Sequence, residues 1–353
     1  MSGCAFFPGQ EAGHQGNGSF IALLWNVQAL FDGQEHGSEY VEFRETSGWT
    51  QEKYQARITA ISQAILQMAP PEGSMAVISG KPSKAIAPDL IGFVEIENIG
   101  VLQDLAEALS RHGYNWTAFS IAPGSSSGLG VLSRFPITDL RTHSITRGKL
   151  SAPRPVLELR VEPNGEPIVF LLCHWKSKLG SDTETQRRDS ARIVQRRLRE
   201  LNESGIPLVV MGDLNENHDE FYRYKGSIPG IYSLLPDDSD AALLEEKTPG
   251  DFLVLSGEKP PLSVNFKDVP ALYSPWVAEM DGGSYYYRGD WETIDHFLLS
   301  EWLFSGSLWN YSRCYVLNHE PFVSSKGIPN AYVPRYGGGL SDHLPLLLFL
   351  KFL

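Results

Sequence analysis

The sequence predicts a single α/β domain over residues 19–353, preceded by a flexible leader over residues 1–18. Apolar runs of strand length alternate with amphipathic segments of helix length, which is typical of α/β folds. Several of the apolar runs end on Asn, Asp, Glu or His, as strands do where a ligand site opens. No internal repeat or low-complexity linker divides the chain into two domains.

The predicted strands are short apolar runs. In chain order they are Phe20–Val27, Asp89–Ile96, Leu129–Ser133, Pro155–Val161, Ile168–His174, Pro207–Leu214, Thr293–Ser300 and Leu344–Leu353. Most are apolar nearly throughout, as strands buried on both faces are. The run Pro155–Val161 instead alternates apolar and polar residues, which predicts a half-exposed strand.

Three segments carry the periodicity of helices: Trp49–Met68, Leu102–Ser110 and Thr183–Leu201. In the first, apolar residues recur three and four positions apart, and Thr50 is the expected N-cap. The third carries its apolar residues among many arginines, which predicts a surface helix. Residues Glu216–Asp290 are rich in Pro, Gly, Asp and Tyr and are expected to form long loops and short helices.

Composition and charge limit the class of protein. Apolar residues make up 42% of the chain and charged residues 20%, as in folded globular proteins. The net charge of −12 argues against non-specific coating of nucleic acid through a basic surface, although it does not exclude a local basic groove. Three scattered cysteines exclude a disulfide framework and a structural zinc site.

The first residues have two interpretations. Met1–Cys4 looks like the end of a bacterial lipoprotein signal, in which a small residue and Gly precede the lipidated Cys. Cys4 would then anchor a secreted or cell-envelope protein to a membrane, and the polar run through Ser19 would be a tether. The alternative is an ordinary flexible N-terminus on a cytoplasmic protein.

Polar side chains recur at or just beyond the ends of the apolar runs. They are Asn26, Glu95, His174, Asp213 with Asn215, Asp295, and Asp342 with His343. Each alone has a structural explanation as a turn, cap or salt bridge, because a buried polar group must be paired. Together they predict one site, since ligands in α/β proteins gather where strands open into loops. Carboxylates and carboxamides are hard oxygen ligands that suit Mg²⁺.

Five short motifs in one order resemble the endonuclease/exonuclease/phosphatase (DNase I-like) superfamily, and look closest to its bacterial secreted nuclease-like members. The motifs are Trp25–Asp32, Val94–Asn98, His174–Lys178, Gly212–Asn215 and Trp291–His296, with Ser341–Pro345 extending the match toward the C-terminus. The resemblance implies a four-layer sandwich of two packed mixed β-sheets flanked by helices, with the active site at one end.

The resemblance also implies a role for each residue. Glu95 would be the principal ligand of Mg²⁺ or Mn²⁺, with Asn26 and Asp342 beside it. Asp213 would orient or deprotonate the attacking water, and Asn215 would hold a non-bridging phosphate oxygen.

The remaining residues would act on the phosphate. Asp295 would pair with His343 and fix its tautomer, while His174 would contact the phosphate or protonate the leaving oxygen. Substrate phosphates would be contacted by Arg154, Lys176 and Lys178, although a solvated loop position is the alternative for Arg154. The aromatic run Tyr285–Arg288 either stacks on bases or, as the default, packs beneath a loop.

These residues together predict a metal-dependent hydrolase of phosphate esters, in which water attacks in line. The expected substrate is DNA or RNA, and no protein partner is inferred. An inositol-phosphate or phospholipid phosphatase or phosphodiesterase is the alternative within the enzyme class. The alternative from another class is a non-catalytic binding protein on the same fold. Such a protein would be expected to lack catalytic residues, whereas this sequence contains all of those that the resemblance implies.

Overall fold

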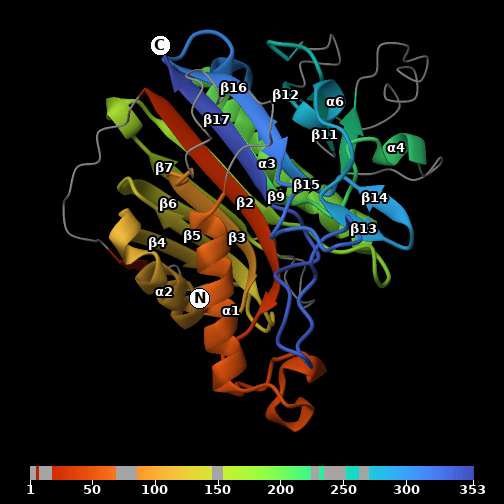
Figure 1. The fold of residues 1–353 in the computed structure, drawn as a ribbon. Coiled ribbons are helices and arrows are strands. Elements are labelled where there is room, and N and C mark those ends of the chain that lie inside the picture. The colour runs from red at the N-terminus through yellow and green to blue at the C-terminus, as the bar shows by residue number, and fades with distance from the viewer. Residues whose placement is uncertain are drawn as a thin grey trace.

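The computed structural model describes residues 5–7, 18–68, 86–144, 154–223, 230–233, 252–261 and 270–353. Two large mixed sheets dominate it (Figure 1). In spatial order, the first sheet contains β1 (Ala5–Phe7), β4 (Trp116–Ser120), β5 (Gly128–Ser133), β3 (Leu90–Ile96), β2 (Ser19–Leu30), β17 (Leu346–Phe352) and β16 (Trp309–Val316). The second contains β10 (Ile231–Ser233), β11 (Leu253–Ser256), β12 (Ala271–Tyr273), β15 (Asp295–Leu299), β9 (Leu208–Asp213), β8 (Ile168–His174), β7 (Val156–Val161) and β6 (Ile137–His143).

A separate hairpin and several helices complete the described part of the chain. The hairpin is β13 (Tyr285–Tyr287) with β14 (Asp290–Glu292). The α-helices are α1 (Gln51–Leu66), α2 (Ile99–Ala108), α3 (Thr183–Glu203), α4 (Glu220–Arg223) and α6 (Pro275–Ala278). Short 3₁₀ helices are η1 (Val41–Phe43), η2 (Glu45–Ser47), η3 (Ser110–His112), η4 (Pro163–Gly165) and η5 (Glu301–Leu303).

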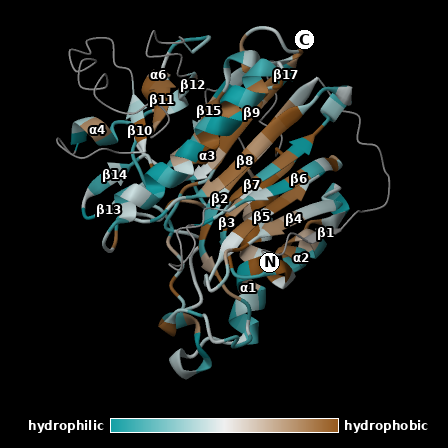
Figure 2. Cartoon of the chain, turned by 180° about the vertical axis from the view of Figure 1, so that it is seen from behind, coloured by the Kyte–Doolittle hydropathy of each residue, from teal (hydrophilic) through white to brown (hydrophobic). Residues whose placement is uncertain are grey.

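The elements form four layers, which confirms the predicted fold class. Helices α1 and α2 cover the outer face of the first sheet (Figure 1), and α3 covers that of the second (Figure 2). The strands facing the interior are strongly apolar (Figure 2), and side chains from both sheets form one buried cluster between them. At Gly92 a Cβ atom would lie 1.9 Å from Met211 Cε of the opposite sheet. A side chain at position 92 would therefore have to displace the end of the Met211 side chain where the two sheets pack closely.

Three expectations differ from the structure. Within the expected leader, Ala5–Phe7 forms β1, antiparallel to β4 at the edge of the first sheet. Strand β7, expected to be half-exposed, is buried because its Glu158 is paired with Arg197 of α3. The segment Glu216–Asp290, expected to hold loops and short helices, also contributes β10, β11 and β12 to the second sheet.

One expectation is outside what the structure tests. Cys4, the residue that would carry a lipid, lies outside the described residues. Among those residues, the structure contains no helix with the length and apolarity required to cross a membrane.

The topology brings the ends of distant strands together at one end of the sandwich. Strands β2 and β3 are parallel neighbours, so Asn26 lies opposite Val94, one residue before Glu95. In the second sheet β8 and β9 are parallel, with His174 paired with Asp213. Since β15 runs antiparallel to β9, its first residue, Asp295, also pairs with Asp213.

Candidate active site

One cavity of about 320 Å³ lies at this end of the sandwich. Eight of the eleven predicted site residues line it: Glu95, Arg154, His174, Lys178, Asp213, Asn215, Asp342 and His343. Two others, Asn26 and Asp295, are buried and hydrogen-bond to residues of the lining. Lys176 is not part of the lining, and its carbonyl oxygen instead accepts a hydrogen bond from Arg187.

Asn26 joins the two sheets at the floor of the cavity. Its Nδ2 donates to Asp213 Oδ2 at 3.0 Å and lies 3.4 Å from Glu95 Oε1. Its Oδ1 accepts from the backbone N–H of Gln28 at 3.0 Å. In this arrangement Asn26 orients two carboxylates with its N–H groups. Its Oδ1 keeps a second lone pair beside the hydrogen bond from Gln28, so its role as a metal ligand stays a prediction.

Left-handed backbone places Glu95 in the cavity. Glu95 has φ 70°, and Gln28 and Ala29, which lie in a bulge of the neighbouring strand, both have φ 53°. The bulge turns the N–H of Ala29 toward Glu95 Oε2, with an N···O distance of 2.7 Å. Non-glycine residues in this conformation carry strain, which persists where the surroundings hold them and often marks functional sites.

His343 forms a buried pair with Asp295, as predicted. The Nδ1 of His343 lies 2.7 Å from Asp295 Oδ2, which also accepts from Ser284 Oγ at 2.6 Å. Burial alone would lower the pKa of His343, but the charge and hydrogen bond of Asp295 hold it well above its usual value. Nε2, on the other side of the ring, lies 3.5 Å from Asn26 Nδ2 and 4.0 Å from Asp342 Oδ1. His343 therefore presents a cationic imidazole to the cavity.

His174 and Asp213 are pushed toward their neutral forms. His174 Nε2 lies 3.7 Å from both Glu95 Oε1 and Asp213 Oδ2. Burial, followed by the charge of Arg154, holds the pKa of His174 well below its usual value. Burial, followed by the charge of Asp295, raises the pKa of Asp213 to about 7. A carboxylate with a pKa near neutrality can take a proton from water at physiological pH.

The polar residues at the mouth are held by neighbouring groups. Arg154 Nη1 and Asn215 Nδ2 each donate to the carbonyl oxygen of Trp175 at 3.0 Å. Arg154 is therefore anchored in the lining of the cavity. Lys178 lies 2.9 Å from Glu220 and 3.8 Å from Glu292.

The structure adds five aromatic or apolar residues that sequence reasoning did not assign to the site: Tyr40, Leu179, Tyr285, Tyr287 and Ile294. Tyr285 stacks on the imidazole of His343, with ring centroids 4.6 Å apart, and Tyr287 stacks on Tyr285 at 6.1 Å. Tyr285 and Tyr287 lie in a run noted in the sequence, but the default expectation was packing beneath a loop. Nothing in the local sequence pattern identified Tyr40 or Leu179.

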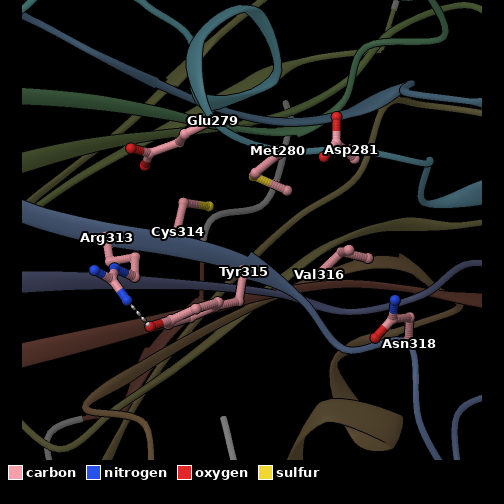
Figure 3. A pocket seen from close by; sticks show the side chains of 8 residues that line it. All are labelled: Glu279, Met280, Asp281, Arg313, Cys314, Tyr315, Val316 and Asn318. Atoms are coloured by element: carbon pink, nitrogen blue, oxygen red, sulfur yellow. Dashed lines mark hydrogen bonds between the residues drawn. The ribbon is translucent and has the colours of Figure 1, made fainter. Parts of the chain in front are cut away.

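A second cavity, of about 410 Å³, lies elsewhere, and none of the predicted residues line it (Figure 3). It is lined by Glu279, Met280, Asp281, Arg313, Cys314, Tyr315, Val316 and Asn318. Arg313 donates to the hydroxyl of Tyr315 at 3.1 Å, and burial raises the pKa of the Cys314 thiol above its usual range.

The donor set of the first cavity fits a hard divalent cation. Four carboxylates, Glu95, Asp213, Glu292 and Asp342, line it, and Asp295, which pairs with Asp213 in the sheet, adds a fifth. Asp295 Oδ1 is buried without a hydrogen-bond partner. One potential ligand atom from each of Asp213, Asp295 and His343 lies within 4.8 Å of the others. So many carboxylates in a buried space repel one another unless a cation neutralises them, and oxygen ligands suit Mg²⁺ or Mn²⁺.

Comparisons with known proteins identify the family and the fold. The model of the endonuclease/exonuclease/phosphatase family matches residues 23–343. No match is found among curated protein sequences.

Solved structures share the fold at low sequence identity. An endonuclease/exonuclease/phosphatase from Beutenbergia cavernae is 18% identical with a TM-score of 0.50, covering 95% of this chain and 72% of its own. The D. rerio TDP2 complexed with single strand DNA product is 12% identical with a TM-score of 0.52, covering 95% of this chain and 100% of its own. A mannosyl-6-phosphatase from Bacteroides thetaiotaomicron is 15% identical with a TM-score of 0.50, covering 94% of this chain and 100% of its own.

Proposed function

The chain belongs to the endonuclease/exonuclease/phosphatase family and is therefore a phosphoric ester hydrolase, and we propose that it is a metal-dependent phosphodiesterase that cleaves DNA or RNA. One observation carries the proposal. A single cavity joins the His343–Asp295 pair to Glu95, Asp213 and Asp342, so that a cationic hydrogen-bond donor faces a set of carboxylates. Phosphodiester cleavage needs both, because charge on the phosphate oxygens must be stabilised while water attacks.

Glu95 and Asp342 are the residues that would hold Mg²⁺ or Mn²⁺. Glu95 is fixed by the N–H of Ala29, and the nearest ion-pair partner of Asp342 among the described residues is His343 Nε2 at 4.0 Å. When bound, the cation supplies Lewis-acid stabilisation of the charge on the phosphate oxygens.

Side chains of the protein accept the proton from water and stabilise the charge on the phosphate oxygens. Asp213, held by the Asn26 amide at 3.0 Å, takes the proton of the attacking water. The cationic His343 donates from Nε2 to a non-bridging phosphate oxygen, and Asn215 holds a second. His174 is neutral at physiological pH, so of its two predicted roles we favour the phosphate contact over proton donation.

The rim of the cavity supports a nucleic acid substrate. Tyr287 and Tyr40 are 42% and 40% exposed, and Leu179 is 76% exposed. Exposed aromatic faces beside a phosphate site suit nucleobases, because every base offers a π-face to stack on. An inositol polyphosphate would instead require several cations, and both Arg154 and Lys178 already have protein partners.

A substrate panel tests the proposal. Purified full-length protein is incubated with Mg²⁺ or Mn²⁺ and with plasmid DNA, single-stranded DNA, RNA, an inositol phosphate or a phospholipid. We expect cleavage of nucleic acid, with loss of turnover in EDTA and in Glu95→Gln. Intact nucleic acids together with hydrolysis of the lipid or inositol ester would exclude the nuclease and favour the alternative.

Replacement of Tyr287 tests the rim. Stacking on a nucleobase contributes about 1–3 kcal/mol, so Tyr287→Ala should raise KM for an oligonucleotide roughly 10-fold and change kcat little. Tyr287→Phe should retain the wild-type KM, because it retains the ring. Tyr336→Ala is the matched control, since Tyr336 is 77% exposed but outside the cavity. Equal KM values for Tyr287→Ala and the wild type would contradict stacking of a nucleobase on Tyr287.

A further inference from the structure

We propose that Asp32, His36 and Glu97 form a second divalent-cation site, separate from the catalytic cavity. One potential ligand atom from each residue lies within 4.8 Å of the others. None of the three residues lines the catalytic cavity. Asp32 follows the end of β2, Glu97 follows the end of β3, and these strands are parallel neighbours. The sheet therefore places the two carboxylates together, and His36 approaches them from the loop after β2.

Glu97 offers an oxygen that no described group satisfies. Its side chain belongs to a residue only 4% exposed, and its Oε1 has no hydrogen-bond partner. The other oxygen, Oε2, accepts from the N–H of Asp32 at 2.7 Å, which fixes the carboxylate beside Asp32. A buried carboxylate oxygen without a partner is costly, and coordination to a cation would satisfy it.

The cluster contains more negative than positive charge. Among the described residues, neither Asp32 nor Glu97 forms an ion pair with a lysine or arginine, and His36 is the one basic side chain paired with Asp32. A third carboxylate, Glu39, lies in the same loop and accepts from the N–H of Gly37 at 2.9 Å. A divalent cation would balance the two carboxylates that face each other.

The positions of the ligands are compatible with a common ion. His36 Nε2 lies 3.1 Å from Asp32 Oδ2, a separation that two ligands each about 2.1 Å from one metal can have. Asn98 Nδ2 donates to Asp32 Oδ2 at 2.9 Å, and Gln34 N donates to Asp32 Oδ1 at 2.7 Å. Such bonds from neighbouring groups hold ligand side chains in place at metal sites.

The ligand types indicate the class of cation. Two carboxylates and one imidazole suit a transition metal such as Mn²⁺ or Zn²⁺ better than Mg²⁺ or Ca²⁺, which take oxygen ligands almost alone. A bound ion would tie the ends of β2 and β3, the strands that carry Asn26 and Glu95. We therefore expect it to stabilise the protein, whatever the substrate is.

Metal titration of full-length protein tests the site without any assay of hydrolysis. Metal-free Glu95→Gln, which weakens the catalytic site, is titrated with Mn²⁺ and Zn²⁺ by calorimetry and with Co²⁺ by visible absorption. We expect one tight equivalent to remain, with a Co²⁺ spectrum that indicates a nitrogen ligand. Adding His36→Gln should weaken that equivalent at least about 10-fold and remove the metal-dependent rise in Tm.

The His36→Gln variant should fold as the wild type does, because the His36 side chain is 47% exposed. Its matched control is His112→Gln, an exposed histidine on η3 that should change nothing. The site is refuted if Glu95→Gln binds no tight equivalent, or if His36→Gln leaves the affinity, the Co²⁺ spectrum and the Tm shift unchanged.

Discussion

The charge of His343 depends on one buried neighbour. Asp295 contacts its Nδ1 at 2.7 Å, and its charge and hydrogen bond are what raise the pKa of the imidazole against the effect of burial. The same pair is held by the segment that leads into the β13–β14 hairpin. Ser284 Oγ donates to Asp295, and the backbone of Tyr285 forms a β-bridge with that of His343. The two side chains therefore act as one unit.

Removing either partner should lower kcat about as much as removing both. We expect Asp295→Asn and His343→Ala each to reduce kcat by on the order of 10²- to 10³-fold, with the double variant close to His343→Ala. The reason is that Asn cannot keep the imidazole cationic or in the required tautomer. Steady-state kinetics on all four proteins measures the coupling, and effects that multiply would contradict the pairing.

At the scale of elements, one helix residue supports the strand bulge that places Glu95. Arg57 of α1 is buried and donates to the carbonyl oxygens of Val27, Gln28 and Ala29 at 2.6, 2.6 and 2.9 Å. Its guanidinium lies 3.9 Å from the ring centroid of Tyr332. Burial lowers the pKa of Arg57 to about 10, so the group stays charged at neutral pH. The guanidinium presents its donors in a fixed planar fork, a geometry that a lysine ammonium cannot reproduce.

Arg57→Lys should therefore disturb the catalytic site as well as stability. We expect Tm to fall, and kcat with saturating metal to fall at least about 10-fold at a temperature where the variant is folded, because the bulge no longer presents the Ala29 N–H to Glu95. Thermal melts and metal-dependence curves measure the two effects separately. Arg111→Lys, at an exposed position on η3, is the control. A lower Tm with unchanged kcat would assign Arg57 a purely structural role.

At the scale of the whole molecule, buried ion pairs connect the helical layers to the sheets. Glu158 of β7 is bound by Arg197 of α3, with two N···O distances of 2.7 Å, and by His143 of β6, also at 2.7 Å. Burial alone would raise the pKa of Glu158, but these hydrogen bonds and charges lower it to about 2. Since the folded pKa is below the unfolded value, the pair stabilises the fold above about pH 4.5.

Glu158→Gln should destabilise the protein in a pH-dependent way. We expect a loss of roughly 2 kcal/mol in the free energy of unfolding at pH 7, which shrinks as pH falls from about 5 toward 2 and Glu158 of the wild type becomes protonated. Urea denaturation at a series of pH values measures the difference. Glu162→Gln is the control, because its ion pair with Arg160 is more exposed, with 37% of the Glu162 side chain accessible. A difference that does not change with pH would contradict this account.

Sequence alone determined the fold class and most of the candidate site. Apolar runs with a polar last residue identified Glu95, His174 and Asp213 at the ends of β3, β8 and β9, because burial and strand period are local properties of the chain. The order of the motifs identified the family, whose model matches residues 23–343. Polar edge strands such as β6 (Ile137–His143) escaped this reasoning, since a half-exposed edge has no continuous apolar run.

Only the tertiary structure decided how distant residues act on one another. It placed Tyr285 against His343 and set the amide nitrogen of Asn26 toward Asp213. It also buried Glu158 by pairing it with Arg197, which lies 39 positions further along the chain. It also brought Asp32 beside Glu97 through the parallel pairing of β2 and β3. The physical reason is that hydrogen-bond partners and desolvation depend on which strands and helices become neighbours, and local periodicity does not record that order.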